Sequence, residues 1–193
     1  MSHQVVIPHK GSLSAGLAAW LAETGNTPLL EKRNGLCKGR NILMERFLSE
    51  TSADWLVYLD DDNWPASEGL IEFATRGDYP FVGLPYLFTN WRWSFGLREE
   101  DQMRWWSTYK PGGEYSFAPA WLVGGGGICL HRETVKALPQ PIWQEAPTDL
   151  PPEDVLFSYT LTKKLGVPCA TVWGGALHHD KGGFDLLNLV CIQ

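Results

Sequence analysis

Short apolar runs alternate with amphipathic segments along most of the chain, and this alternation predicts strands and helices in turn. The clearest strand is Asp54–Leu59, a run of large apolar side chains that leads into three aspartates. The clearest helix is capped by Ser12 or Ser14 and ends near Gly25. Further strands are expected at residues 4–7 (stopped by Pro8), 27–30, 81–87, 128–130 and 170–173, and further helices at 40–50, 65–75 and 153–165. This order predicts an α/β fold with a mainly parallel central sheet flanked by helices.

Residues 86–123 break the alternation because they are rich in Trp, Phe and Tyr and show little helical period. We expect strands and long loops there. Their tryptophans can stack on the C–H faces of an acceptor sugar, form a dimer surface through which the chain oligomerises, or belong to the core. The candidates for acceptor contact are Trp91, Trp93, Trp105 and Trp106.

Composition and charge narrow the class of protein. The 193 residues fit one domain, with 44% hydrophobic and 20% charged residues, as in an ordinary globular enzyme. The net charge of −6 gives no general attraction to nucleic acid. No apolar run is long enough for a membrane span, and the N-terminus lacks the basic leader of a secretion signal. Four cysteines without CxxC spacing indicate reduced thiols, and hence the cytoplasm.

Three adjacent aspartates, Asp60, Asp61 and Asp62, follow the strand that ends at Leu59. Ligands of open α/β sheets bind beyond the carboxyl ends of strands. Neighbouring carboxylates repel one another, and a bound cation relieves that repulsion. In an extended segment Asp60 and Asp62 project to the same side. They can share one divalent ion, or one can bind the ion while the other holds a ribose hydroxyl. The alternative is a solvated acidic turn before the next helix.

The stretch ADWLVYLDDDNWP resembles the DxD segment of GT-A glycosyltransferases, and it is most similar to small bacterial and phage enzymes related to glycosyltransferase family two. The resemblance implies one Rossmann-like GT-A domain over residues 1–193, with a nucleotide-sugar part over about 1–90 and an acceptor and catalytic part over about 91–193. It implies that Asp60 and Asp62 hold Mn²⁺ or Mg²⁺ against the donor diphosphate. Asp60 and Asp61 are counted among the donor contacts as well.

Three further segments resemble the same family. VVIPH resembles its first strand, which abuts the nucleobase, and GRNIL resembles a helix opening near the nucleotide. GGGGICLHRE resembles a glycine-rich strand followed by a helix, where glycines let the backbone approach a ligand. The residues that these segments assign to the donor are Pro8, His9, Arg40, Asn41, Gly125 and Gly126.

Glu153 and Asp154 begin a predicted helix that ends at Lys163 and Lys164, an arrangement that suits the helix dipole without any catalytic role. The EDxxF pattern also resembles the Glu-Asp motif of inverting GT-A enzymes, in which an acid takes the proton of the acceptor hydroxyl. By that resemblance Asp154 is the candidate base and Glu153 the second choice.

His178 and His179 follow the last predicted strand, and Lys181 comes soon after. Many GT-A enzymes complete the metal site with a late histidine. The resemblance therefore implies that one of these imidazoles joins the DxD carboxylates and the phosphate oxygens around the metal. Lys181 can meet the diphosphate or remain solvated.

The sequence thus predicts a metal-dependent glycosyltransferase that moves one sugar from a nucleotide-sugar, by default a UDP-sugar, to an acceptor hydroxyl with inversion. Residues 29–33 lack the DDGS segment that contacts the base in related enzymes, which leaves the base open. The QxxRW motif of processive synthases is absent, which favours single additions. The cytoplasm expected from the cysteines can be that of a phage-infected host.

The acceptor stays open among a glycan, a lipid-linked sugar, a protein and a hydroxylated base of phage-type DNA. For DNA, the basic contacts expected are Arg92, Arg98, Arg104 and Lys110. Two other functions compete with glycosyl transfer. One is a sugar-nucleotide pyrophosphorylase or related nucleotidyltransferase, for which the loop after the first strand is short and weakly basic. The other is a non-catalytic carbohydrate-binding module with a structural calcium ion.

Overall fold

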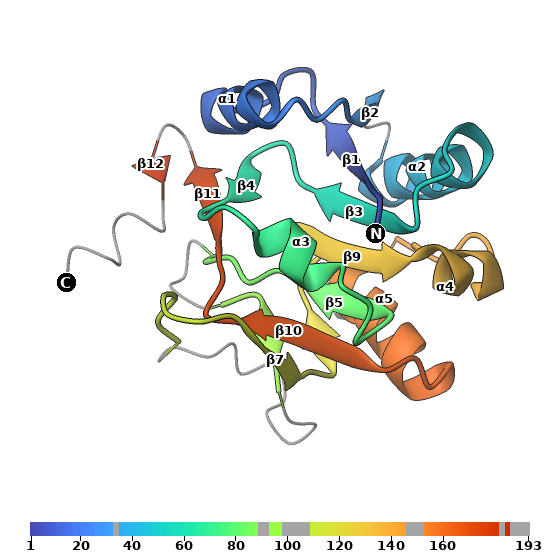
Figure 1. Ribbon diagram of the computed structural model, residues 1–193. Helices are drawn as coiled ribbons and strands as arrows, with labels where there is room; N and C mark the ends of the chain where they lie inside the picture. The colour runs from blue at the N-terminus through green and yellow to red at the C-terminus, as the bar shows by residue number, and fades with distance from the viewer. Residues whose placement is uncertain (33–34, 89–92, 98–108, 146–152, 182–183, 186–193) are drawn as a thin grey trace.

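The computed structural model describes residues 1–32, 35–88, 93–97, 109–145, 153–181 and 184–185. Its central element is a seven-stranded sheet in the order β2-β1-β3-β9-β5-β10-β7 (Figure 1). The strands are β1 His3–His9, β2 Leu29–Lys32, β3 Trp55–Leu59, β5 Phe81–Gly83, β7 Ser116–Pro119, β9 Gly127–His131 and β10 Cys169–Trp173. All run in one direction except β9 and β7, which are antiparallel to their neighbours. The mainly parallel α/β sheet predicted from the sequence is confirmed.

Helices cover both faces of this sheet because the strands are apolar on both sides. Within β3, Trp55, Val57 and Leu59 belong to one buried cluster and Leu56 and Tyr58 to the other. The first cluster includes residues of α1 Ala15–Thr24 and α3 Leu70–Ala74. The second includes residues of α2 Leu36–Glu50, α4 Arg132–Ala137 and α5 Glu153–Tyr159. Two cores therefore sandwich the sheet.

Two small sheets extend the edge where β3 ends. β4 Asn63–Pro65 pairs with β11 Leu177–Lys181, which also pairs with β12 Phe184–Asp185, and β6 Phe95–Gly96 pairs with β8 Leu122–Val123. The expectation that Pro65 begins a helix is wrong, since residues 63–65 are held as a strand by β11 and α3 begins only at Leu70. His178 and His179 likewise lie inside β11, opposite Trp64 and Asn63, and not after the last strand.

Other element boundaries differ from the sequence prediction. Pro8 does not end β1, because β3 pairs with β1 only as far as Val6 and β2 alone accompanies the strand beyond it. The N-terminal cap of α1 is Ser14, whose hydroxyl accepts a hydrogen bond from the Leu17 N–H. After α5 the chain continues as a π-helical turn, Thr160–Lys164.

The thiols of Cys37, Cys129 and Cys169 are buried and free, as expected, whereas Cys191 lies outside the described residues. Over the ranges that the structure describes, none of the helices is both long and apolar enough to cross a membrane.

Trp64, two residues after the aspartates, lies between α1 and β11. Its ring stacks on His178 with centroids 5.0 Å apart. A Cβ atom at Gly16 of α1 would come within 2.3 Å of the Trp64 ring, so this glycine lets the helix approach the indole. The contact ties the start of α1 to the strand that leaves the aspartates.

We predict that Gly16→Ala lowers the free energy of unfolding by about 1 kcal/mol or more, because the overpacking of Trp64 outweighs the helix propensity of alanine. Urea denaturation followed by circular dichroism measures the change. Ala19→Ser, an exposed substitution in the same helix, is the control and should stay within about 0.5 kcal/mol of the parent chain. A Gly16→Ala chain as stable as the control would contradict the packing argument.

Candidate active site

The exit of β3 and the entry of β9 meet at one edge of the sheet, because the two strands are antiparallel. Leu59 pairs with Gly127, and the Asp60 N–H donates a hydrogen bond to the Gly126 carbonyl at 3.2 Å. The aspartates and the glycine-rich segment, separated by more than sixty residues in sequence, are thereby brought into contact. The start of α5 reaches the same edge through Asp154, whose carboxylate accepts from the Gly125 N–H at 3.3 Å.

Arg40 lies at the centre of this edge and is only 1% exposed. Its guanidinium contacts Asp60 Oδ1 at 3.1 Å and Glu153 Oε1 at 3.4 Å, and it lies over the Trp143 ring at 4.4 Å. Burial lowers the pKa of Arg40, but the carboxylates of Asp60 and Glu153 outweigh that effect and hold the pKa above its ordinary value. One buried cation thus joins the aspartate corner, the turn formed by Asp60, Asp61 and Asp62, to the acidic start of α5. Arg40 belongs to the second turn of α2 and not to a helix opening.

Gly125 and Gly126 leave room for the side chains that converge here. A Cβ on Gly125 would lie 2.6 Å from the Arg40 guanidinium, and one on Gly126 would lie 2.5 Å from the Asn63 amide. Their N–H groups donate to Asp154 and to the Tyr86 hydroxyl, respectively. In this structure the glycines admit the protein's own side chains, and their contact with a donor stays a prediction.

The two acids of the EDxxF segment have different surroundings. Glu153 is paired with Arg40, whereas Asp154 is 9% exposed and has no ion pair within the described part of the chain. Burial, and secondarily the charge of Glu153, raises the pKa of Asp154, against the opposing hydrogen bond from Gly125. A carboxylate with a raised pKa is a stronger proton acceptor, which suits a general base.

Asp62 faces β11 and not Arg40. Its Oδ1 is 3.8 Å from His179 Nε2, and its Oδ2 accepts from Lys181 Nζ at 2.6 Å. His179 is 4% exposed, and its Nδ1 lies 2.6 Å from the Leu87 carbonyl. Since a carbonyl only accepts, Nδ1 carries a proton, and in the neutral ring the lone pair of Nε2 faces Asp62. Burial lowers the pKa of His179, which favours this neutral form.

These donors fit a divalent cation that takes most of its ligands from elsewhere. Two ligands of one Mg²⁺ ion are separated by about 3 Å in adjacent positions and about 4 Å in opposite ones, and the Asp62–His179 gap falls between these values. Within the described residues, no three Asp, Glu, His or Cys side chains are grouped so that they could hold a metal. The pair therefore suits an ion completed by phosphate oxygens and water, as Mg²⁺ prefers. Arg40 engages Asp60 through Oδ1, and the assignment of Asp60 to the metal beside Asp62 stays a prediction.

The second histidine and the middle aspartate have other roles. His178 points to the opposite side of β11, where it stacks on Trp64, so its assignment to the metal is wrong in this structure. Asp61 is 8% exposed, and its carboxylate accepts from the Lys10 N–H at 2.8 Å, which fastens the loop after β1. Its predicted role at the donor stays a prediction.

The remaining donor candidates lie on both sides of the sheet edge. Pro8 is buried in β1 beside Glu31, and His9 is half-buried at the end of that strand. Lys181 is partly exposed next to Asp62. Asn41 lies on α2 next to Arg40, and both ends of its amide bond the main chain of Trp143.

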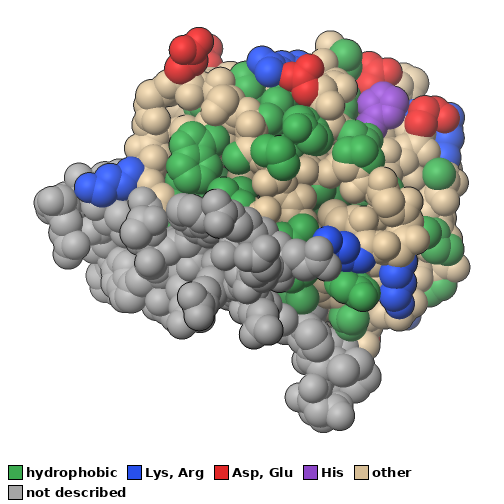
Figure 2. All heavy atoms as spheres, turned by 90° about the horizontal axis from the view of Figure 1, so that it is seen from below, with side chains coloured by type: hydrophobic (Ala, Val, Ile, Leu, Met, Phe, Trp, Pro, Cys, Tyr) green, Lys and Arg blue, Asp and Glu red, His purple; other side chains and the backbone are tan. Residues whose placement is uncertain are grey.

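The aromatic region is only partly described. Trp91, Trp105 and Trp106 lie outside the described residues, as do Arg92, Arg98 and Arg104, while Lys110 is exposed. Trp93 is 2% exposed and packs edge-on against Tyr109 in the core, so the prediction that it faces an acceptor is wrong for this structure. Figure 2 views the side on which β7 and β10 lie in Figure 1. Among its described residues, hydrophobic side chains form several patches, and Lys and Arg side chains lie scattered around them.

Sequence reasoning missed three residues of the site. Tyr86, 4% exposed, accepts from the Gly126 N–H and lies edge-on to the His179 ring, but nothing in its spacing distinguishes it from the other residues of the apolar run 81–87. Asn63 is fully buried and donates to the Gly126 carbonyl at 2.9 Å. Its place directly after the aspartates was the signal in the sequence that could have found it. Nothing in the sequence around Trp143 points to the site.

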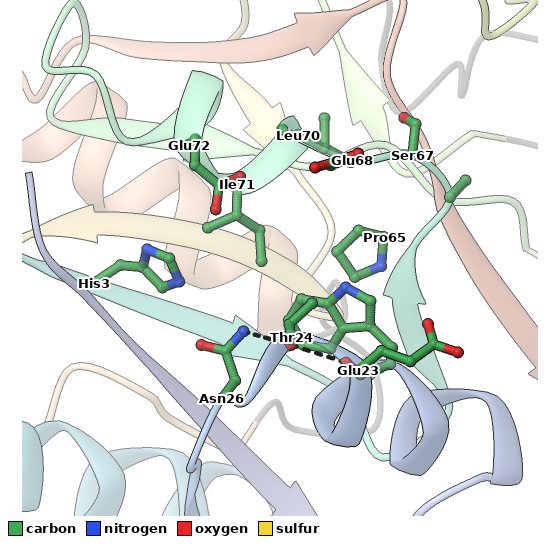
Figure 3. A pocket seen from close by; sticks show the side chains of 13 residues that line it. His3, Glu23, Thr24, Asn26, Pro65, Ser67, Glu68, Leu70, Ile71 and Glu72 are labelled. Carbon is green, nitrogen blue, oxygen red and sulfur yellow. Dashed lines mark hydrogen bonds between the residues drawn. The ribbon is translucent and has the colours of Figure 1, made fainter.

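One cavity of the described structure lies away from these residues. It has a volume of about 810 Å³ and lies between α1 and the segment from Pro65 to Glu72 (Figure 3). Its lining includes Glu23, Glu68 and Glu72 but neither Lys nor Arg. Such a cavity repels a diphosphate, and we do not assign it to a nucleotide-sugar.

Comparisons with known proteins agree with this geometry. The family model described as Fringe-like matches residues 19–182, most of the chain. No curated protein matches the sequence. The crystal structure of A197 from STIV is similar with a TM-score of 0.75 and 20% identity, over 95% of this chain and 87% of that one.

Two glycosyltransferase structures share the fold. One, involved in glycosylation of the major capsid of PBCV-1, has a TM-score of 0.51 and 13% identity over 89% of this chain and 82% of its own. The other is GalNAc-T7 with UDP, GalNAc and Mn²⁺, with a TM-score of 0.54 and 13% identity over 95% of this chain and 45% of its own. These similarities show the GT-A fold.

We predict that Arg40→Met lowers the free energy of unfolding by about 3 kcal/mol or more, because it removes the buried guanidinium that pairs with the part-buried carboxylates of Asp60 and Glu153. Urea denaturation measures it. Arg46→Met is the matched control in the same helix, since Arg46 pairs with Glu50 near the surface and should change stability by about 1 kcal/mol at most. Equal effects of the two substitutions would contradict the central place of Arg40.

Proposed function

The chain belongs to the Fringe-like family of glycosyltransferases, and on this premise we propose that it moves one sugar from a UDP-sugar to an acceptor hydroxyl with the help of Mn²⁺ or Mg²⁺. The observation that carries the proposal is the pair formed by Asp62 and His179 Nε2, whose lone pair faces a carboxylate oxygen 3.8 Å away. Two electron-rich atoms that face each other across such a gap are stabilised when a cation lies between them.

Asp62 and His179 are the proposed metal ligands from the protein. When bound, the ion neutralises the donor diphosphate and stabilises the departing nucleotide as a Lewis acid. Lys181, partly exposed and paired with Asp62, is the residue that we assign to the same phosphates. His9, at the end of β1, is the residue that we assign to the nucleotide side of the donor.

Asp154 is the proposed general base. It takes the proton of the acceptor hydroxyl while the acceptor oxygen forms a bond to the anomeric carbon. The bond from that carbon to the diphosphate breaks, and its electron pair leaves with the nucleotide. A single displacement of this kind inverts the anomeric centre. Glu153 is less suited to the role because its carboxylate is paired with Arg40.

The proposed donor and acceptor classes are supported by two structures that share the fold. GalNAc-T7 is described with UDP and Mn²⁺, which favours a UDP-sugar and a metal here. The structurally similar PBCV-1 enzyme is involved in glycosylation of the major capsid, which favours a protein among the four acceptor classes expected from the sequence, and all four are to be offered. Release of pyrophosphate from a nucleoside triphosphate would instead indicate the nucleotidyltransferase alternative.

For the metal, we predict that UDP binds in the presence of Mn²⁺ and that Asp62→Ala and His179→Ala each weaken this binding by on the order of tenfold or more. Asp62→Ala should also abolish sugar transfer. Isothermal titration calorimetry with and without Mn²⁺ gives the affinities. His178→Ala is the matched control, since its ring lies on the other side of β11 and its removal should leave UDP affinity unchanged. Metal-independent UDP binding that survives both substitutions would refute the assignment.

For the base, we predict that Asp154→Asn keeps UDP–Mn²⁺ affinity and slows transfer by on the order of 10²-fold or more. Because the base acts in its ionised form and its pKa is raised, activity of the parent enzyme should fall, as pH decreases, at a higher pH than an ordinary aspartate would give. Turnover is measured across pH as UDP released from UDP-glucose, UDP-galactose or UDP-N-acetylglucosamine. Asp78→Asn, an exposed acid, is the control. An Asp154→Asn enzyme with unchanged turnover moves the role to Glu153 or elsewhere.

A further inference from the structure

Asn41 is bound to the main chain of Trp143 through both ends of its amide. Its Nδ2 donates to the Trp143 carbonyl at 2.8 Å, and the Trp143 N–H donates to its Oδ1 at 3.0 Å. This is the pairing that a neighbouring strand would provide, supplied here by one side chain. The bonds fix the segment around residue 143, which has no regular secondary structure, against α2.

The ring of Trp143 connects the segment held by Asn41 to α5. It is stacked on Phe157 with centroids 3.8 Å apart and planes within 2°, and the Arg40 guanidinium lies over the indole at 4.4 Å. Trp143 and Phe157 are each 1% exposed, so neither ring can move without repacking the core. Phe157 is one helical turn from Glu153 and three residues from Asp154, so the stack determines where these acids lie.

The other side of α5 is held by a second pair of contacts. Ser158 Oγ donates to the Val123 carbonyl at 2.9 Å and accepts from the Val123 N–H at 3.2 Å, while Asp154 accepts from Gly125. Asp154 and Ser158, four residues apart on α5, thus bind Gly125 and Val123, which are two residues apart in the chain. α5 is fastened from this side to the glycines and from the Trp143 side to α2.

We propose that Asn41 is a positioning residue for the reaction: by holding Trp143, it sets α5, and with it Asp154, against the aspartate corner. The proposal rests on the proposed function, in which Asp154 is the base. It replaces the contact between Asn41 and the nucleotide expected from the sequence. A general base that is displaced by even about 1 Å slows the reaction by on the order of 10²-fold. The contact between Asn41 and Trp143 should therefore affect turnover and not donor affinity.

Asn41→Ala tests the proposal. The expected result is a fall in kcat of on the order of tenfold or more with UDP–Mn²⁺ affinity unchanged within about twofold. Faster hydrogen–deuterium exchange of the amides of residues 153–159 should accompany it. Ser49→Ala, on an exposed position of the same helix, is the control and should alter none of the three measurements. Weaker UDP binding with kcat kept at saturating donor, or α5 exchange equal to that of the parent chain, would overturn the proposal.

Trp143 provides a second, independent pair of variants. Trp143→Phe keeps an aromatic ring on Phe157 and should retain most of the turnover, whereas Trp143→Leu removes the stacked ring and should reproduce the loss seen with Asn41→Ala. Both are assayed below the onset of thermal unfolding. Equal turnover of the Phe and Leu variants would contradict the role of the stack. If the parent chain neither binds UDP–Mn²⁺ nor transfers sugar, the proposed function fails, while the exchange of α5 in Asn41→Ala still tests the positioning on its own.

Discussion

The burial of one guanidinium is the constraint on which the rest of this site depends. Arg40 is taken out of water, and the carboxylates of Asp60 and Glu153, together with the Trp143 ring, offset the cost of that burial. Those acids come from the end of β3 and the start of α5, and the cation comes from α2. The three elements are therefore stable in this arrangement only together, and Gly125 must lack a side chain for the guanidinium to fit.

The three consecutive aspartates each contact a different partner. Asp60 turns inward to the buried cation, and Asp61 fastens the loop after β1. Asp62 faces His179 and the exposed amino group of Lys181. Three like charges in a row are thus separated by giving each a different partner, so their mutual repulsion is relieved even before a ligand arrives. A similar division separates Glu153, which is paired, from Asp154, which is buried beside it.

The hydrophobic pattern of the chain was enough to predict the sheet, its covering helices and the position of the aspartates at the end of a strand. A strand that is buried on both faces, such as β3, consists of consecutive apolar residues and is easily recognised in the sequence. The pattern was not enough for β4 or β11, whose pairing depends on a partner more than a hundred residues away. Nor could it choose between His178 and His179, which differ only in the side of β11 that they face. Tyr86 and Trp143 were missed because a buried aromatic residue looks the same in sequence whether it packs a core or shapes a site.

The reversed direction of β9 has a consequence for how such an enzyme diversifies. β5 ends and β9 begins at the same edge, where the Leu84 N–H donates to the Gly127 carbonyl at 2.9 Å. The chain between them contributes β7 to the same sheet, where it pairs with β10, while β5 and β9 pair with each other. A change in length between β5 and β7 therefore need not move the aspartates after β3, because β5 stays paired with β9 and β7 stays paired with β10. On the proposed function, a change of this kind is a route to a new acceptor that leaves the paired strands of the sheet unchanged.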